Sequence, residues 1–291
     1  MPIRCVIFDF DGTLTRVDEE CVPFVATYRA ELARDLELTD LELSERWSAA
    51  ERFVDAAVTQ YGWTDREGRI VAPAYADPMI KCRVVTTELL SRMGMYEDGD
   101  ARLALLDRLF QTSYAAMDPR GIFREEAPEI LRAIVGSGLP VFVVTNSNAE
   151  KVRFKLQSVV PSLLPQLTVI GDARKYEVVS GSEPWAGPER VESEQYIDGL
   201  ARPIYPRRPH YLARLEEIAK VTRCAPHETV VCGDIWELDL LLPAKLGMQV
   251  HLVNRPQTAE LDKRTVRELL EGTVSDTLRG LTERLGLVLA A

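Results

Sequence analysis

The stretch CVIFDFDGTLT, which runs from Cys5 to Thr15 of this 291-residue chain, joins an apolar run to a pair of aspartates. Its first four residues are apolar and predict a buried β-strand. The strand ends at two aspartates, Asp9 and Asp11, and isolated carboxylates in such a place cost several kcal/mol unless something compensates them. An Asx turn with a helix cap is the plain use of such aspartates. A site that gathers charge at the end of the strand is the other interpretation.

The chain from Gly121 onward alternates between helical and strand patterns. Short, continuous apolar runs of the kind that a parallel strand buried on both faces requires occur at 139–148, 166–172, 228–234 and 248–255. Amphipathic segments between and after them predict helices at 127–138, 149–160, 209–224, 238–247 and 274–290. Such alternation predicts an α/β fold with a right-handed, doubly wound parallel sheet of the Rossmann-like kind.

A different pattern separates the first strand from this α/β region. Residues 16–120 carry long charged segments with apolar residues at helical spacing and hardly any β-branched runs. We therefore expect an all-helical second domain at 16–120, inserted into a core made of residues 1–15 and 121–291. Within the core, residues 172–207 form an unusually long connection, and the alternation around 177–187 favours a small hairpin or flap.

The composition is that of an ordinary globular protein, with 46% hydrophobic and 27% charged residues. A formal net charge of -10 disfavours general binding to nucleic acids or anionic membranes, since both favour a basic protein surface. The five cysteines are scattered without metal-binding spacing, which indicates reduced thiols and a cytoplasmic protein. The sequence has no basic-then-apolar leader and no apolar run of about eighteen residues, so we expect neither export nor a membrane span.

A second acidic cluster follows another apolar strand. In the stretch GDIWELD, Asp234 and Asp239 come just after the apolar run TVVC. The carboxyl ends of parallel strands line the ligand crevice of an open α/β sheet, so Asp9, Asp11 and this second cluster can face one crevice. Carboxylates gathered there repel one another, and their hard oxygen ligands favour Mg²⁺ as the neutralising cation. We therefore expect a Mg²⁺ site.

These motifs resemble those of the haloacid dehalogenase (HAD) superfamily of phosphatases and phosphotransferases, in the right order and across most of the core. The first motif of that superfamily, D-x-D-G-T, is present at 9–13. The second, an apolar strand that ends in Thr or Ser, is filled by Thr145. The fourth, G-D-x-x-x-x-D, is present at 233–239. The resemblance implies a mobile cap domain directly after the first motif, a position that residues 16–120 match.

The third motif of the superfamily is a cation, usually a lysine before a proline at a helix start, about two dozen residues ahead of the fourth motif. Arg208 stands directly before Pro209 and 26 positions before Asp234, so the resemblance implies that Arg208 takes this place. Arg207 beside it could serve instead. Lys175 is the rival, but it lies 59 positions ahead of Asp234 and outside a predicted helix start. A flap contact or a surface position is therefore the better interpretation of Lys175.

By this resemblance, the chemistry can be assigned residue by residue. Asp9 is expected to attack a phosphoryl group in line and to form an aspartyl-phosphate. Asp11 is expected to protonate the leaving oxygen and then to accept a proton from the attacking water. Asp9, Asp234 and the backbone carbonyl of Asp11 are expected to bind Mg²⁺.

The remaining motif positions are expected to bind the phosphate or to orient other groups. Thr145 and Arg208 would bind nonbridging oxygens, and Asp239 would orient Arg208 or a metal-bound water. The expected substrate site also contains Gly12, Thr13 and Asn146. A helix cap before the stretch NAEK is the plainer interpretation of Thr145.

The sequence favours a Mg²⁺-dependent phosphatase that hydrolyses a small phosphorylated metabolite through an aspartyl-phosphate. Asp11 supports phosphate chemistry, because dehalogenases of the superfamily typically lack this second aspartate. A phosphomutase shares the four motifs, and phosphonate cleavage would need an imine-forming lysine from the insert, where Lys81 is the only lysine. A catalytically silent scaffold or regulatory protein is the alternative from another class. Neither the substrate nor the oligomeric state follows from the sequence.

Overall fold

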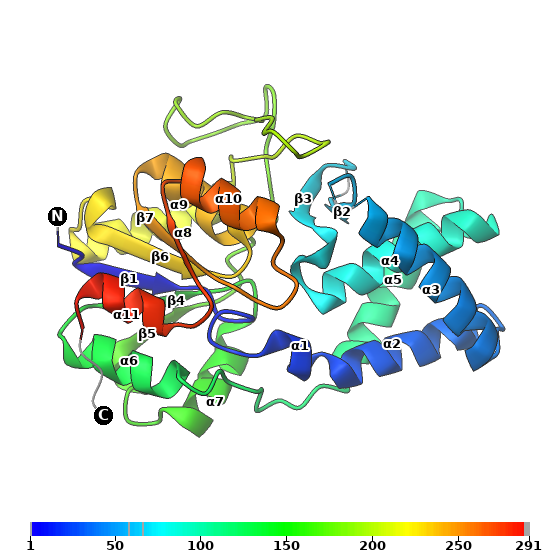
Figure 1. The fold of residues 1–291 in the computed structure, drawn as a ribbon, viewed down its shortest axis with the longest axis horizontal. Coiled ribbons are helices and arrows are strands. Elements are labelled where there is room, and N and C mark those ends of the chain that lie inside the picture. Colours follow the sequence, from blue (N-terminus) through cyan, green and yellow to red (C-terminus); the bar gives the residue numbers. More distant parts are fainter. Residues whose placement is uncertain (1, 58, 66, 288–291) are drawn as a thin grey trace. The chain divides into compact units, whose positions relative to one another are not determined.

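A parallel β-sheet forms the centre of the larger of two compact units (Figure 1). The computed structural model describes residues 2–57, 59–65 and 67–287. The sheet has six strands in the order β5 (Leu167–Ile170), β4 (Val141–Val144), β1 (Cys5–Phe8), β6 (Thr229–Gly233), β7 (Gln249–Val253) and β8 (Thr273–Ser275). Each neighbouring pair of strands is parallel. The doubly wound α/β core predicted from the sequence is therefore confirmed.

Helices cover both faces of this sheet. One face carries α6 (Ala127–Gly136), α7 (Ala149–Val159) and α11 (Arg279–Leu285), and the other carries α8 (Pro209–Thr222), α9 (Leu241–Leu246) and α10 (Glu260–Glu268) (Figure 1). The helix predicted at 274–290 is wrong at its start, because Thr273–Ser275 form the edge strand β8 and α11 begins only at Arg279. In the described part of the chain, no helix has the length and apolar character that a membrane crossing requires.

Burial explains why the first strand lies in the middle of the sheet. All four residues of β1 are fully buried, and Val6 and Phe8 pack in one cluster with apolar residues of α6, α7 and α11. A large apolar side chain contributes roughly 1.5–3 kcal/mol when it is buried in this way. In the register of the sheet, Phe8 pairs with Cys232 of β6. The residues that follow β1 and β6 therefore emerge beside each other at the same edge.

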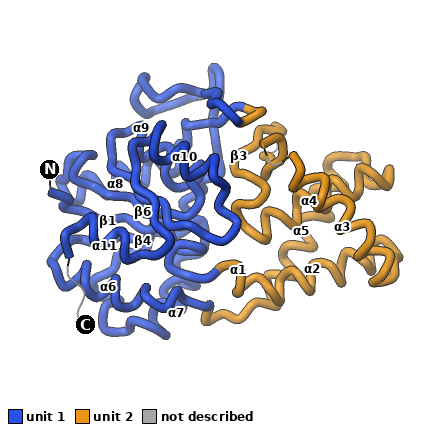
Figure 2. The backbone as a smooth tube through the Cα atoms, viewed as in Figure 1, with its two compact units in different colours: residues 1–16, 122–199, 203–291 blue, residues 17–121, 200–202 orange. Residues whose placement is uncertain are grey.

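The second compact unit comprises residues 17–121 and 200–202 and is mostly helical (Figure 2). Its helices are α1 (Val17–Glu20), α2 (Val22–Asp35), α3 (Asp40–Ala56), α4 (Pro78–Met93) and α5 (Gly99–Tyr114). The expectation of an entirely helical insert is wrong in one respect. The strands β2 (Gly62–Thr64) and β3 (Ile70–Pro73) pair as an antiparallel hairpin within this unit.

Side-chain caps fix where the helices of the second unit begin. Thr39 and Glu42 form a reciprocal capping box at the start of α3. Asp77 accepts hydrogen bonds from two backbone N–H groups in the first turn of α4, and Asp98 accepts one in the first turn of α5. Caps of this kind each contribute about 1 kcal/mol to helix stability. The helical pattern read from residues 16–120 therefore has local causes.

The long connection between β5 and α8 is irregular in the described structure. Residues 177–187, where the sequence favoured a hairpin or flap, form no strand in the described structure. Gln195 and Ile204 form an isolated antiparallel bridge instead, and Ile204 is fully buried. The guanidinium group of Arg190 donates to the carbonyl of Leu246 at 3.1 Å. Arg190 thus connects this part of the segment to α9 (Leu241–Leu246).

Candidate active site

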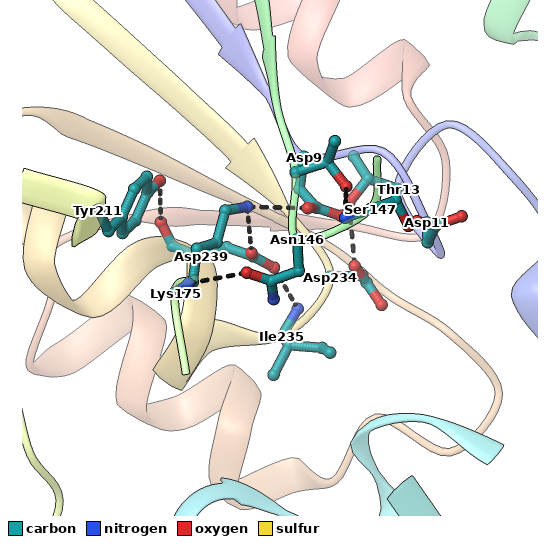
Figure 3. A network of polar contacts seen from close by, with 11 residues as sticks. Asp9, Asp11, Thr13, Asn146, Ser147, Lys175, Tyr211, Asp234, Ile235 and Asp239 are labelled. Carbon is teal, nitrogen blue, oxygen red and sulfur yellow. Dashed lines mark hydrogen bonds and ion pairs between the residues drawn. The ribbon is translucent and has the colours of Figure 1, made fainter. Parts of the chain in front are cut away.

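Three carboxylates meet beyond the carboxyl ends of β1 and β6 (Figure 3). Asp9 directly follows β1, and its backbone N–H donates to the carbonyl of Cys232 in β6 at 2.8 Å. Asp234 directly follows β6, and Asp239 lies in the π-helical turn Trp236–Leu240. Each of the three aspartates offers a carboxylate oxygen, and these oxygens lie within 4.8 Å of one another. The parallel pairing of two strands thus gathers acidic residues from distant parts of the sequence.

Lys175 is a cation of this cluster. Its Nζ atom donates hydrogen bonds to Oδ1 of Asp9 and to Oδ1 of Asp239, each at 2.8 Å (Figure 3). The lysine side chain is only 1% exposed. The interpretation of Lys175 as a surface residue is therefore wrong. Lys175 is a cation that contacts both Asp9 and Asp239, and binding of a phosphate oxygen by Arg208 stays a prediction. Asp239 binds Lys175, and the expected role of Asp239 in orienting Arg208 or a metal-bound water stays a prediction.

Three neighbours hold Lys175 in place. Oδ1 of Asn146 accepts from the backbone N–H of Lys175 at 2.7 Å, and the fully buried guanidinium group of Arg208 donates to its carbonyl. The ring of Tyr211 lies 5.2 Å from the ammonium group, and the Tyr211 hydroxyl donates to the backbone carbonyl of Asp239 at 2.9 Å. Arg208 and Tyr211 belong to the start of α8. The start of α8 was expected to supply the cation of the site. Its residues help to position Lys175.

Burial and charge oppose each other in this cluster. Burial alone would lower the pKa of Lys175, but the carboxylates of Asp239 and Asp9 outweigh it and raise the pKa above its ordinary value of 10.5. The lysine is therefore an ammonium ion at physiological pH. Burial raises the pKa of Asp9, and the Asp239 and Asp234 carboxylates add to the rise, while Lys175 opposes it. The cluster thus holds more negative charge than Lys175 alone compensates.

The first motif is shaped around Asp234. The hydroxyl of Thr13 lies 3.0 Å from Oδ1 of Asp234 and 3.3 Å from Oδ2 of Asp9, so it bridges the two carboxylates. Nε of Arg255 forms an ion pair with Oδ2 of Asp234 at 2.8 Å, and both side chains are almost fully buried. Position 12 has to be glycine, because a Cβ on Gly12 would lie 2.2 Å from Oδ2 of Asp234 and its φ is +85°. Gly12 of the first motif therefore leaves room for Asp234, the aspartate of the fourth motif.

Asp11 has partners of its own on the side of the cluster away from Lys175 (Figure 3). Its Oδ2 atom accepts from the hydroxyl of Ser147 at 2.6 Å. Its Oδ1 atom lies 3.4 Å from Nζ of Lys155, which comes from α7. The two aspartates of the first motif are thus held by different sets of side chains.

Thr145 follows β4 and is buried beside these groups. Its hydroxyl oxygen accepts from the backbone N–H of Ser147 at 3.0 Å. The cap of α7 is Asn148, whose side chain accepts from two backbone N–H groups of the first turn. The interpretation of Thr145 as a helix cap is therefore wrong. A contact between its hydroxyl group and a phosphate stays a prediction.

Four residues that contact the predicted site residues were not predicted from the sequence: Ser147, Lys155, Tyr211 and Arg255. Position gave a usable signal for two of them. Ser147 lies two residues after Thr145 at the end of β4, and Arg255 lies two residues after the end of β7. Both are therefore at the sheet edge where ligands bind in open α/β folds. Lys155 and Tyr211 lie within helices, where apolar periodicity gives no reason to single them out.

The oxygen atoms of the cluster fit a divalent cation such as Mg²⁺. Asp9, Asp234 and Asp239 supply hard carboxylate ligands within 4.8 Å of one another, as Mg²⁺ prefers. Asp9 and Asp234, which directly follow β1 and β6, are the residues that would hold the ion. The hydroxyl of Thr13 keeps these two carboxylates next to each other. A bound cation would also favour the charged form of Asp9, whose raised pKa reflects its burial and its acidic neighbours.

A family model of haloacid dehalogenase-like hydrolases matches residues 3–176 of the chain. The matched region contains the D-x-D-G-T stretch, Thr145 and Lys175. No curated protein shows a significant match to the sequence.

Solved structures of similar fold cover nearly the whole chain. A predicted phosphoglycolate phosphatase from Haemophilus somnus is 14% identical with a TM-score of 0.53, and the alignment covers 97% of each chain. The protein YfnB of Bacillus subtilis, assigned to the HAD hydrolases and bound to magnesium, is 13% identical with a TM-score of 0.51, over 98% of this chain and 100% of that one. A HAD family hydrolase from Deinococcus radiodurans, with bound phosphate and sodium, is 17% identical with a TM-score of 0.50, over 99% of each chain. A dehalogenase is also among the matching structures, with 16% identity and a TM-score of 0.45.

Proposed function

Because the chain belongs to the haloacid dehalogenase-like hydrolase family, we propose that it is a Mg²⁺-dependent phosphatase that hydrolyses a small phosphorylated metabolite. The observation that carries this proposal is the position of Asp9, a buried carboxylate between the ammonium group of Lys175 and the hydroxyl of Thr13. A nucleophile benefits from such a fixed position, and an anionic phosphate benefits from the neighbouring cation.

In the first half of the proposed reaction, a carboxylate oxygen of Asp9 attacks phosphorus. The new O–P bond forms as the P–O bond to the leaving alcohol breaks, and that electron pair goes to the leaving oxygen. Asp11 gives its proton to this oxygen, so a neutral alcohol departs. Lys175, at 2.8 Å from Oδ1 of Asp9, orients the nucleophile and places positive charge next to the transferring group.

In the second half, water attacks the phosphorus of the aspartyl-phosphate. Asp11, now a carboxylate, accepts the proton of the water as the bond between phosphorus and the Asp9 oxygen breaks. Inorganic phosphate leaves and Asp9 is regenerated. A group that serves as acid and then as base in this way contributes ~10²–10⁴-fold to the rate.

Asp9 and Asp234 would hold Mg²⁺ together with the backbone carbonyl of Asp11, which the family resemblance adds. When bound, the ion neutralises the charge gathered between nucleophile and phosphate. Lys175 and Thr145 are the proposed ligands of the phosphoryl oxygens, with Lys175 in the role that was expected for Arg208. Contacts within the protein favour a role in shaping this site for Gly12, Thr13 and Asn146.

Two observations favour phosphate ester hydrolysis over the other reactions of the family. Asp11 stands at the site with a hydrogen bond from Ser147, and a proton donor helps an alcohol to leave but is not needed by a halide. Phosphonate cleavage would need a neutral amine from the insert. Burial alone would lower the pKa of Lys81, but its ion pairs with Glu51 and Asp55, both at 3.0 Å, raise it. Lys81 is therefore charged and unsuited to imine formation.

Residues 16–120 are the proposed cap domain, and residues 1–15 with 121–291 are the proposed catalytic core. The compact units divide the chain between Arg16 and Val17 and again between Gly121 and Ile122 (Figure 2). The first division comes directly after the D-x-D-G-T stretch. A cap attached at this place would exclude water and select the leaving group, which favours a small metabolite as substrate.

The test is phosphate release from p-nitrophenyl phosphate and from a panel of phosphorylated metabolites, with Mg²⁺ and after chelation. We expect Mg²⁺-dependent turnover by the wild type and none by Asp9→Asn, which keeps the size of the side chain. Thermal unfolding of both proteins checks that the variant is folded. Equal turnover would refute the nucleophile, and two folded but inert proteins would support a scaffold. Transfer of phosphate to a second hydroxyl group of the substrate would indicate a mutase.

A further inference from the structure

The carboxylate of Asp11 is held at both of its oxygen atoms by side chains from one segment. Oδ2 accepts from the hydroxyl of Ser147 at 2.6 Å, and Oδ1 lies 3.4 Å from Nζ of Lys155. Ser147 precedes α7 and Lys155 lies within that helix. We propose that Ser147 and Lys155 are positioning residues that aim the Asp11 carboxyl group at the leaving oxygen, an inference that rests on the proposed phosphatase function.

Ser147 is fixed from both sides of its backbone. Its N–H donates to the hydroxyl oxygen of Thr145 at 3.0 Å, and its carbonyl accepts from the N–H of Asp172 at 3.0 Å. Gly171 allows this close approach, because a Cβ there would lie 2.7 Å from the carbonyl oxygen of Ser147. The Ser147 hydroxyl is therefore presented to Asp11 by a turn between β4 and α7 whose backbone is held by two hydrogen bonds.

A hydroxyl group suits this position because it can hold Asp11 in both of its states. It donates to Oδ2 of the carboxylate, and it can still donate to Oδ2 of the carboxylic acid when the proton is on Oδ1, because Oδ2 is then the carbonyl oxygen. Ser147 can therefore keep Oδ2 in place while Oδ1 loses and regains the proton. This leaves Oδ1 as the working oxygen of Asp11.

Lys155 contributes a partly desolvated cation to the other oxygen. Its side chain is only 12% exposed, and its Nζ atom lies 5.5 Å from the centre of the Phe10 ring. The Phe10 ring is fully buried and contacts Phe123 edge to face at 5.8 Å. The cation–π contact with Phe10 helps to hold the Lys155 ammonium group beside Asp11. The long 3.4 Å contact to Oδ1 can be given up when a leaving group arrives, whereas the 2.6 Å contact from Ser147 stays.

The dependence of the rate on the leaving group tests this inference. p-Nitrophenolate departs without a proton, whereas the alkoxide of glycerol 2-phosphate needs one. With Ser147→Ala or Lys155→Met, we expect kcat on glycerol 2-phosphate to fall about 10- to 100-fold. On p-nitrophenyl phosphate the same variants should stay within about threefold of the wild type, since acid catalysis adds little there. Asp11→Asn should show the same selectivity with a larger loss.

Matched controls separate this role from a general effect on the fold. Lys151→Met removes an exposed lysine one turn earlier on α7 and should leave both substrates unaffected, and Lys155→Arg should restore part of the loss. Equal losses on both substrates, or no loss on either, would overturn the inference. A wild type that releases phosphate from neither ester would instead show that the proposed function fails, and the inference with it.

Discussion

Replacing Lys175 with methionine removes the one cation that binds both Asp9 and Asp239 among the contacts of the described residues. The two carboxylates lie 2.8 Å from the ammonium group, and the lysine side chain is 1% exposed. Methionine fills a similar volume without the charge. The variant therefore tests whether Lys175 holds the cluster together or merely lies beside it.

The expected size of the effect follows from these distances. At 2.8 Å and an effective dielectric constant of about 20, each contact supplies roughly 6 kcal/mol of Coulomb attraction. The cost of desolvating the lysine offsets much of this gain. Breaking a buried ion pair by removing one partner typically costs about 3–5 kcal/mol, because the other charge is left uncompensated. We expect Lys175→Met to lower the free energy of unfolding by about that amount.

The pH dependence gives the prediction a second readout. The pKa of Lys175 is raised above 10.5, so its stabilising contribution is fully present below pH 10.5 and is lost only as the pH rises beyond that value. The difference between wild type and variant should therefore be constant between pH 7 and pH 9. Mg²⁺ should reduce the difference, because a bound cation replaces part of the missing charge.

Urea unfolding followed by circular dichroism measures these free energies in the presence of a chelator and with Mg²⁺. Lys151→Met serves as the control, since it removes a lysine from an exposed position. A loss below about 1 kcal/mol in Lys175→Met, the range of an exposed ion pair, would show that Lys175 does not hold the cluster together. Stabilisation of the variant by Mg²⁺ that is no greater than that of the wild type would count equally against this role of Lys175.

Three further changes have defined outcomes. Gly12→Ala should cost at least about 1–2 kcal/mol in urea unfolding because φ is +85°, and the new methyl group should also displace Asp234; wild-type stability would contradict this. Asp234→Asn should abolish the rise in Tm that Mg²⁺ gives the wild type, and an unchanged rise would place the ion elsewhere. Burial, with a smaller effect of Arg284, lowers the pKa of His251 from 6.5 to about 4. The neutral His251 therefore contributes about 3 kcal/mol to stability above pH 6.5, and this contribution is lost as the pH falls toward 4. The difference in the free energy of unfolding between wild type and His251→Gln should shrink over that pH range. A constant difference would contradict the lowered pKa.

The parts of the fold that could be predicted from the sequence depend on continuous apolar runs. β1 and β6 bury every residue, so their pattern is visible without any knowledge of the neighbouring strands. The edge strand β8 and the hairpin strand β2 have three residues each with mixed exposure. Segments this short carry no periodicity, and their pairing is decided by the elements next to them. This is why the sequence pattern indicates an entirely helical insert and places β8 within a helix.

Some residues of the candidate site could likewise be predicted from the sequence, and others could not. Asp9, Asp11 and Asp234 could be found because each follows a buried strand that the pattern reveals. Lys175 could be named only as the rival of Arg208, because it lies 33 positions ahead of Arg208, which marks the expected helix start. The two residues are nevertheless in contact, because the guanidinium group of Arg208 donates to the backbone carbonyl of Lys175. Doubling the length of such a loop costs only about 0.6 kcal/mol, so distance in sequence is a weak guide to distance in space.

Whether Asp9 accepts a phosphoryl group next to a bound divalent cation can be tested without knowing the substrate. Fluoroberyllate mimics a phosphoryl group bound to an aspartate, and fluorine NMR reports its bound form directly. We expect protein-bound fluorine signals for the wild type with Mg²⁺, and none for Asp9→Asn or for the wild type after chelation. Bound signals that persist in Asp9→Asn, or a wild type that shows none with Mg²⁺, would contradict this role of Asp9.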